Sequence, residues 1–302
     1  MRIVRRLEYH PGSREEKIGW SQDFPYQASR ALLDEYRDPF VPWHWHGAFE
    51  LFYVESGEVT YQTPGGVTRV PAGWAGLVNT NVLHSTSIRP KLAPNVQLLH
   101  LFEPRLLAGD CGAIGEKYLR PVTDSAAELL TFAPHQPGGP ELIRRIRDAF
   151  ALQEGAWGYE LEVRQALSGI WLQMLRLCGP ALPGRPPAAA RAADKVKQMM
   201  AYIQQHYPEP ITAAGLAGAV YLSERGCYRA FRTQLHMTPA AYLRQTRVRA
   251  ACRLLAETQA PVTEIGYACG LGSPSHFGQI FRAATGCTPL QYRRKWQDPD
   301  KK

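Results

Sequence analysis

The chain of 302 residues lacks the features that mark several classes of protein. No apolar run approaches the roughly 20 residues that a helix needs to cross a bilayer. The N-terminal stretch MRIVRRLEYHPGSREEK is charged and has no apolar core after it, so it does not resemble a secretory signal. These absences predict a cytoplasmic protein with no membrane partner.

Cysteine is scattered, and no two cysteines form a CxxC pair. This spacing argues against a zinc knuckle or a disulfide scaffold, and we expect most of these residues to be small buried apolar groups. Nor does the sequence place a nucleophile beside a base, so we do not predict an enzyme. The cysteines are Cys111, Cys178, Cys227, Cys252, Cys269 and Cys287.

The net charge of +8 is unevenly distributed along the chain. Residues 191–302 contain 16 Lys and Arg against 7 Asp and Glu, whereas residues 1–190 contain 19 against 20. A basic segment beside a neutral one is typical of a polyanion-binding module joined to another domain. Charge alone leaves DNA, RNA and an anionic membrane as candidate partners.

The first part of the chain has the composition of short strands. Between Phe40 and Phe102, aromatic and β-branched runs are broken by Gly and Pro, which predicts several antiparallel strands joined by turns. The segment APHQPGGP at 133–140 has the composition of a linker.

Two helices and a second linker are expected next. Leu142, Ile143 and Ile146 lie on one stripe with Ala149 and Phe150, which is the spacing of an amphipathic helix. A second helix is expected from Tyr159 to Cys178, and GPALPGRPPAAA at 179–190 is a second linker.

The basic third of the chain contains two similar helical sets. In the first set, Ile211-Thr212 opens a short helix that carries Leu216 and Val220 inward, and Ser223 caps the helix that follows. Cys227, Phe231 and Ala230 are its expected core residues. Serine caps a helix because its oxygen accepts a hydrogen bond from an unpaired backbone N–H.

In the second set, Val262-Thr263 opens a helix with Ile265 and Ala268, and Gly270 ends it. Ser273-Pro274 then starts a helix with Phe277, Ile280 and Phe281 inward. Each set is a helix, a tight turn and a helix, which is helix-turn-helix architecture.

The two sets repeat one another at an offset of 50 residues. Ser223 to Tyr242 matches Ser273 to Tyr292 without a gap. At this point the chain resembles the AraC/XylS family of bacterial regulators, whose signature it departs from only at Gly266 (Ala in the family) and Leu271 (Phe). The residues that carry the resemblance are Ile265-Gly266, Gly270-Leu271, Phe277, Phe281-Arg282, Gly286, Thr288-Pro289 and Tyr292-Arg293.

The resemblance implies a sequence-specific DNA-binding transcription regulator that acts on double-stranded DNA. An activator that responds to a small-molecule effector is usual for the family, with RNA polymerase as a further partner. The helices within 141–178 are either a dimerisation element, which would make the protein a homodimer, or a pair packed on its own barrel.

A linker helix over 239–257 is expected to join the two units. About 17 helical residues span roughly 25 Å, which together with the width of the units approaches the ~34 Å of one DNA turn. Outward positions on the recognition helices are the candidate DNA contacts, with Arg225, Arg229 and Gln279 favoured for bases and Arg232 and Arg282 for phosphates. The full set is Glu224, Arg225, Tyr228, Arg229, Arg232, Pro274, Ser275, Gly278, Gln279 and Arg282.

The strand-rich region carries a second resemblance. His44, His46 and Glu50, with six residues between Glu50 and Gly57, resemble the first motif of the cupin barrels. A degenerate second motif follows, with Gly73, Asn79, Asn81 and His84. If strands run through them, residues 44, 46 and 50 share one face.

The cupin resemblance places His44, His46, Glu50 and His84 where cupin enzymes bind a divalent metal. Imidazole and carboxylate groups suit Fe, Mn, Ni or Zn. The same four side chains are also candidates for an effector pocket without metal or for a purely structural cluster. Five aromatic residues are pocket walls or plain core: Trp43, Trp45, Tyr53, Tyr61 and Trp74.

The sequence therefore predicts a multidomain α+β protein. A cupin-like β-barrel sensor occupies residues 1–135, a helical connector and linker 136–190, and an all-α domain with two helix-turn-helix units 191–302. Two alternatives to an effector-responsive regulator stay open. One is a metal-dependent cupin enzyme fused to a DNA-binding module, and the other is a ligand-independent regulator with a vestigial barrel.

Overall fold

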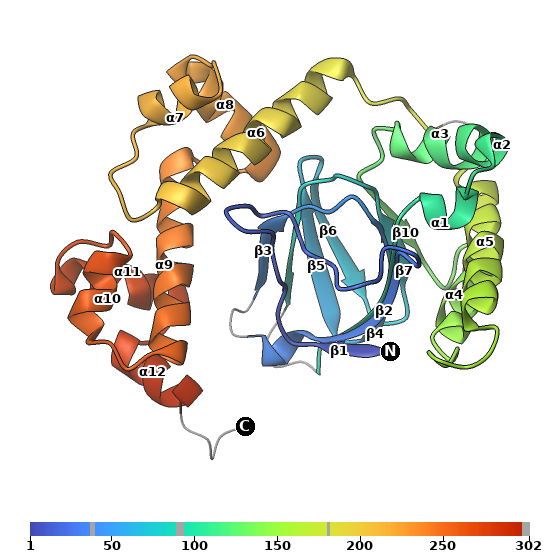
Figure 1. The fold of residues 1–302 in the computed structure, drawn as a ribbon, viewed down its shortest axis with the longest axis horizontal. Coiled ribbons are helices and arrows are strands. Elements are labelled where there is room, and N and C mark those ends of the chain that lie inside the picture. The colour runs from blue at the N-terminus through green and yellow to red at the C-terminus, as the bar shows by residue number, and fades with distance from the viewer. Residues whose placement is uncertain (37–39, 89–93, 180–181, 298–302) are drawn as a thin grey trace. The chain divides into compact units, whose positions relative to one another are not determined.

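The computed structural model describes residues 1–36, 40–88, 94–179 and 182–297. The chain divides into two compact units, one of residues 1–10 and 15–191 and one of residues 11–14 and 192–302 (Figure 1). Within the described residues, no helix is both long and apolar enough to cross a membrane.

The first unit contains two sheets. The six-stranded sheet has the order β1-β2-β9-β4-β7-β10, and the four-stranded sheet has the order β3-β8-β5-β6. Neighbouring strands are antiparallel except β1 and β2, which are parallel. The strands are β1 (Arg2–Val4), β2 (Tyr26–Leu32), β3 (Phe40–His44), β4 (Phe49–Ser56), β5 (Glu58–Thr63), β6 (Gly66–Pro71), β7 (Ala75–Val78), β8 (His84–Ile88), β9 (Val96–Phe102) and β10 (Leu129–Phe132).

Strand β4 is apolar on both faces because both faces are covered. Successive side chains of a strand point to opposite sides. Phe49, Leu51 and Tyr53 therefore face the helices of the unit, and Phe52 and Val54 face the interior between the sheets. Glu50 shares its face with Phe52, so the register of β4 turns this carboxylate inward.

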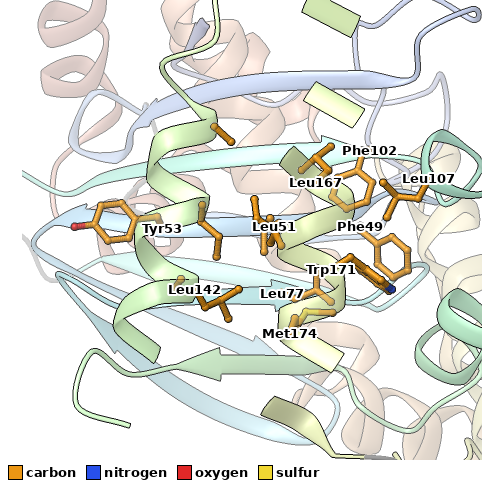
Figure 2. Close-up of a cluster of buried hydrophobic side chains, with 14 of the residues drawn as sticks. Phe49, Leu51, Tyr53, Leu77, Phe102, Leu107, Leu142, Leu167, Trp171 and Met174 are labelled. Carbon is orange, nitrogen blue, oxygen red and sulfur yellow. The ribbon is translucent and has the colours of Figure 1, made fainter. Parts of the chain in front are cut away.

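Helices cover the outer face of the six-stranded sheet. In Figure 2 the side chains of Leu142, Leu167 and Trp171 point from two helices toward the strands. Both helices begin after a glycine in the left-handed region, Gly138 and Gly158. The helices of this unit are α1 (Arg105–Ala108), α2 (Gly112–Ile114), α3 (Arg120–Thr123), α4 (Gly139–Ala149) and α5 (Tyr159–Cys178).

In the second cupin-like motif, the cupin resemblance expects a glycine at position 81, and this chain has Asn81 there, in a turn. Asn81 has φ of 58°, a left-handed conformation that favours glycine and that asparagine tolerates better than most residues. Gly57 of the first motif is required, since its φ is 77° and an added Cβ would lie 2.3 Å from Oδ1 of Asn95.

The second unit is helical, and α9 lies between the two helix-turn-helix units (Figure 1). The expected linker at 179–190 is too long by four residues, because PAAA at 187–190 already belongs to α6; residues 180–181 lie outside the described chain. The helices are α6 (Pro187–His206), α7 (Ala213–Ala219), α8 (Glu224–Leu235), α9 (Pro239–Glu257), α10 (Val262–Ala268), α11 (Pro274–Thr285) and α12 (Pro289–Gln297).

The caps of the recognition helices are those the sequence predicts. Oγ of Ser223 accepts a hydrogen bond from the backbone N–H of Gly226 at 3.1 Å, and Oγ of Ser273 accepts one from His276 at 3.5 Å. The linker helix begins at Pro239 and ends at Glu257, with Thr238 as its cap.

The duplication contains a one-residue insertion that the sequence comparison missed. Leu222 bonds back to Ala217, and Leu271 bonds back to Gly266 in the same way, so the first helices are offset by 49 residues. From Ser223 onward the offset is 50. The additional residue is Gly272, in the turn of the second unit, where φ is 76°.

Two positions of the second unit need comment. Ala268 is exposed, and the inward residue is its neighbour Cys269, because the helix turns by about 100° per residue. Gly266, where the family has alanine, packs against the ring of Phe277, and an added Cβ would lie 2.8 Å from Cδ1 of that ring.

Candidate functional site

The four cupin-motif residues meet between the two sheets. His44 ends β3 and pairs with His84 of β8 in the four-stranded sheet. Glu50 lies in β4 of the other sheet, and His46 lies in the connection between β3 and β4. The even spacing of residues 44, 46 and 50 along the chain is therefore not what brings their side chains together. The chain crosses from one sheet to the other within the motif.

Backbone carbonyl groups orient all three imidazole rings. Nδ1 of His44 lies 2.8 Å from the carbonyl oxygen of Pro42, Nδ1 of His46 lies 3.0 Å from that of Ala48, and Nδ1 of His84 lies 2.9 Å from that of Val82. A carbonyl oxygen only accepts, so each Nδ1 carries the proton. Each Nε2 then faces a carboxyl group of the cluster, that of His44 facing Glu16 and those of His46 and His84 facing Glu50.

The Nε2 atoms of His46 and His84 lie close to the carboxylate of Glu50. Its Oε2 lies 3.3 Å from Nε2 of His46 and 3.5 Å from Nε2 of His84. One ligand atom from each of the four residues lies within 4.8 Å of the others, and all four residues are buried. Nε2 of His84 is buried without a hydrogen bond.

Burial sets the charge states of the cluster. Burial lowers the pKa of His44 well below its ordinary value, and the neighbouring rings of His84 and His46 lower it further. Burial by itself would raise the pKa of Glu50, but the adjacent His46 and His84 lower it well below the ordinary range. Glu50 is therefore a carboxylate, the form in which this side chain binds a metal.

Tyr61 and Gln97 hold the other oxygen of Glu50. The hydroxyl of Tyr61 donates to Oε1 of Glu50 at 2.6 Å, and the amide of Gln97 donates to the same hydroxyl. Oε2 is thereby left facing the histidines. Such support around a metal ligand fixes its orientation.

A fifth group, Glu16, was not among the predicted residues. Its Oε2 lies 3.7 Å from Nε2 of His44 and 3.9 Å from Nε2 of His46, and its side chain is 9% exposed. Burial, with the nearby charge of Glu50, raises its pKa to about 8. No local signal marks Glu16, because its partners lie about 30 residues away.

The space around the cluster is small. A cavity of about 40 Å³ is lined by His44, Glu50 and His84, with Glu16 and Gln97 also in its wall. Of the five aromatic candidates, none lines it among the described residues; they are buried or, for Trp74, half-buried. The aromatic side chain in the wall is Tyr36.

Another buried histidine joins the sheet to the helices. Nδ1 of His100 accepts from the hydroxyl of Tyr26 at 2.7 Å, and its Nε2 donates to the carbonyl oxygen of Ile146 at 3.1 Å. Its ring stacks on Phe150 at 3.6 Å between centroids. Burial lowers the pKa of His100 to about 4, so this ring is neutral at pH 7.

The expected DNA-facing positions lie on the outer sides of α8 and α11. Nine of the ten side chains are exposed, and Gly278 is half-buried. His276, which was not predicted, is also exposed at the start of α11, and its Nδ1 lies 3.0 Å from the carbonyl oxygen of Leu271.

The arginines of the linker helix have different surroundings. Arg244 and Arg253 are exposed. Arg247 instead donates from Nε to the carbonyl oxygen of Tyr207 and from Nη2 to that of Glu209, both at 2.7 Å. Arg247 therefore holds the loop between α6 and α7.

Two family models match the chain. The AraC-like ligand binding domain matches residues 27–170, and a helix-turn-helix domain matches residues 216–295. The chain therefore belongs to the AraC family of transcription regulators. It combines an N-terminal ligand-binding domain with a C-terminal helix-turn-helix DNA-binding domain.

Several regulators resemble the chain in sequence. The HTH-type transcriptional regulator YdeC of Bacillus subtilis is 24% identical over 90% of this chain and 92% of its own length. The HTH-type transcriptional activator RhaS of Enterobacter is 32% identical over 33% of this chain and 36% of its own. The probable regulator LumQ of Photobacterium leiognathi is 35% identical over 30% and 37%. The matches to RhaS and LumQ thus cover little more than one third of the length of each of those proteins.

Two solved structures of regulators also match the chain. ToxT of Vibrio cholerae is 13% identical over 89% of this chain and 98% of its own, with a TM-score of 0.45. The DNA-binding domain of AdpA in complex with a target DNA is 31% identical over 36% of this chain and 96% of its own, with a TM-score of 0.32.

Proposed function

We propose that this regulator senses a divalent transition-metal ion, held by His44, His46, Glu50 and His84, and changes its action on DNA in response. The observation that carries the proposal is the shared orientation of the three imidazoles, whose Nδ1 atoms all bond to backbone carbonyl oxygens. Metal-binding histidines commonly use their second nitrogen in this way.

The separations of the ligand atoms fit a metal. With bonds of about 2.1 Å, ligands at adjacent corners of an octahedron lie about 3.0 Å apart and those at opposite corners about 4.2 Å. The Glu50 oxygen lies 3.3 and 3.5 Å from the two ring nitrogens nearest to it. A contraction of a few tenths of an ångström around the ion would complete the site.

The cavity volume favours an ion over an organic effector. About 40 Å³ is far below the roughly 300–1,000 Å³ of pockets for organic ligands. The same size argues against a cupin enzyme, since an organic substrate needs a larger pocket, and the built donor set argues against a vestigial barrel.

For the DNA contacts, we propose that α8 and α11 each enter a major groove. Arg225, Arg229 and Gln279 contact bases, because Arg and Gln can bond bidentately to guanine and adenine. Arg232 and Arg282 lie one helical turn further along and contact phosphates. The exposure of all five side chains supports this assignment.

We also propose that the protein is a homodimer joined through the outer side of α5. Leu161 is 73% exposed and Leu172 is 42% exposed, and eleven residues of helix place them on one face. A Leu172→Glu variant should sediment as a monomer. The analogous Leu290→Glu, at an exposed leucine of α12, should leave the oligomer intact.

The metal response can be measured on full-length protein. Genomic footprinting supplies a bound site, and affinity for that site is then compared with Fe²⁺ or Mn²⁺ and with a chelator. Coupling between two sites is typically about 1–3 kcal/mol, so the affinity should change by roughly 5- to 150-fold. Activation would be read separately, as transcription by added RNA polymerase.

The control is a pair of variants. His46→Ala with Glu50→Ala should abolish the response, and His135→Ala, at an exposed histidine of the same unit, should keep it. Circular dichroism checks the fold of each protein. A folded double variant that still responds fully would show that these residues do not form the sensor.

A further inference from the structure

Glu16 brings a second carboxyl group beside His44 and His46 from outside both cupin motifs. It lies in the N-terminal segment, and its backbone N–H donates to the carbonyl oxygen of Trp45 at 2.8 Å. This bond holds Glu16 beside the residue that separates His44 from His46. The carboxylate then reaches both rings, at 3.7 and 3.9 Å from their Nε2 atoms.

Two buried carboxyl groups lie among the three imidazoles. Glu16 and Glu50 both reach into the cluster, and the side chain of each is less than 10% exposed. Buried carboxylates are costly unless they are paired or bind a metal. The Nδ1 protons of the histidines go to backbone carbonyl oxygens and not to either carboxyl group.

Glu16 lies between the cluster and a second hollow. Together with Val4 and Gln27, it lines both the small cavity and a larger hollow of about 320 Å³. An ion bound by the histidines and Glu16 would hold that carboxylate, and with it the segment, in place.

From this geometry we infer that Glu16 is a fifth metal ligand and that metal binding fastens the N-terminal segment to the barrel. The inference rests on the proposed metal site. Three nitrogens and two carboxylate oxygens exceed the four ligands usual for structural zinc. The site therefore selects an ion that accepts six ligands, with one position left for water.

Fastening of the N-terminal segment would act on specific backbone hydrogen bonds. The N–H of Lys17 donates to the carbonyl oxygen of Glu8 at 2.8 Å, and the N–H of His10 donates to that of Glu15 at 2.9 Å. These two bonds close a hairpin within the segment, and the bond from Glu16 to Trp45 attaches the hairpin to the barrel. Metal binding should slow exchange of these amide hydrogens and slow trypsin cleavage after Lys17.

The test uses Co²⁺ as the probe on the full-length protein. Glu16→Gln keeps the shape of the side chain and removes the charge, and Glu15→Gln is the matched control in the same segment. We expect Glu16→Gln to weaken Co²⁺ binding by at least about 10-fold. Its visible absorption should intensify as the coordination number falls toward four. Glu15→Gln should match the wild type.

Protection of the segment is the second readout. Co²⁺ should slow cleavage after Lys17 by roughly 5- to 150-fold in the wild type and in Glu15→Gln, but not in Glu16→Gln. Amide exchange on the wild type tests the same point without any variant. His46→Ala should lose Co²⁺ binding altogether.

The outcomes separate the two proposals. If the wild type binds no Co²⁺, the metal site and this inference both fail. If the wild type binds Co²⁺ and Glu16→Gln binds it equally well, with the same spectrum and protection, the metal site stands and Glu16 is not a ligand. Unchanged amide exchange in the wild type on Co²⁺ binding overturns the fastening of the segment.

Discussion

Gly278 allows fold stability and DNA contact to be tested by one substitution. It lies inside α11, its backbone is helical, and an added Cβ would meet no atom within 4 Å. Alanine in a helix interior is about 0.8–1.0 kcal/mol more stable than glycine. The Gly278→Ala variant should therefore raise the free energy of unfolding of the second unit by about 1 kcal/mol.

The same methyl group should weaken DNA binding. Gly278 lies on the proposed DNA-facing side of α11 between Ser275 and Arg282, and a methyl group there would hold the backbone away from the bases. Losing close contacts at one base pair costs about 1–3 kcal/mol, which is about 5- to 150-fold in affinity. Fluorescence anisotropy on a footprinted site measures this loss.

The control is Gly266→Ala in the same helix-turn-helix unit. Its Cβ would lie 2.8 Å from the Phe277 ring, and overpacking costs about 1–3 kcal/mol, more than the helix gains. This variant should be destabilised even though the family has alanine here. Native-state amide exchange within α11 of the full chain reports both stabilities. A stabilised Gly278→Ala variant with unchanged DNA affinity would place DNA on another face.

Three further outcomes are expected. Raising salt from 50 to 200 mM should weaken DNA binding by on the order of 10³-fold, and salt-independent binding would contradict a basic DNA interface. Arg229→Ala should relax base discrimination by about 1–3 kcal/mol, whereas Arg282→Ala should weaken all sequences similarly; equal losses would refute the assignment. His100 has a lowered folded pKa, so its contribution to stability is present above pH 6.5 and is lost as pH falls toward 4, by about 3 kcal/mol. His100→Gln should therefore show a smaller loss of unfolding free energy between pH 6.5 and 4, by chemical denaturation, and an equal loss would show that His100 titrates normally.

Local signals in the sequence were enough for some of the helices and their caps. The helices over Tyr159–Cys178 and Pro239–Glu257 have the predicted bounds, because Gly158, Gly179 and Thr238-Pro239 act on the backbone within one turn. The serine caps of α8 and α11 were predictable for the same reason. The two helix-turn-helix units and the positive charge of residues 191–302 indicated a DNA-binding domain before any tertiary contact was known.

Tertiary structure alone decided which side chains surround the buried histidines. Glu16 reaches His44 across 28 positions of the chain, and His100 meets Ile146 across 46. Neither contact has a period or a spacing that a sequence window can detect. The cupin motif predicted four residues that do meet, but the assumed shared strand face was wrong, since His44 and Glu50 belong to different sheets. Pairing of distant strands depends on packing of the whole core, which is why the sequence could name these four residues and not their geometry.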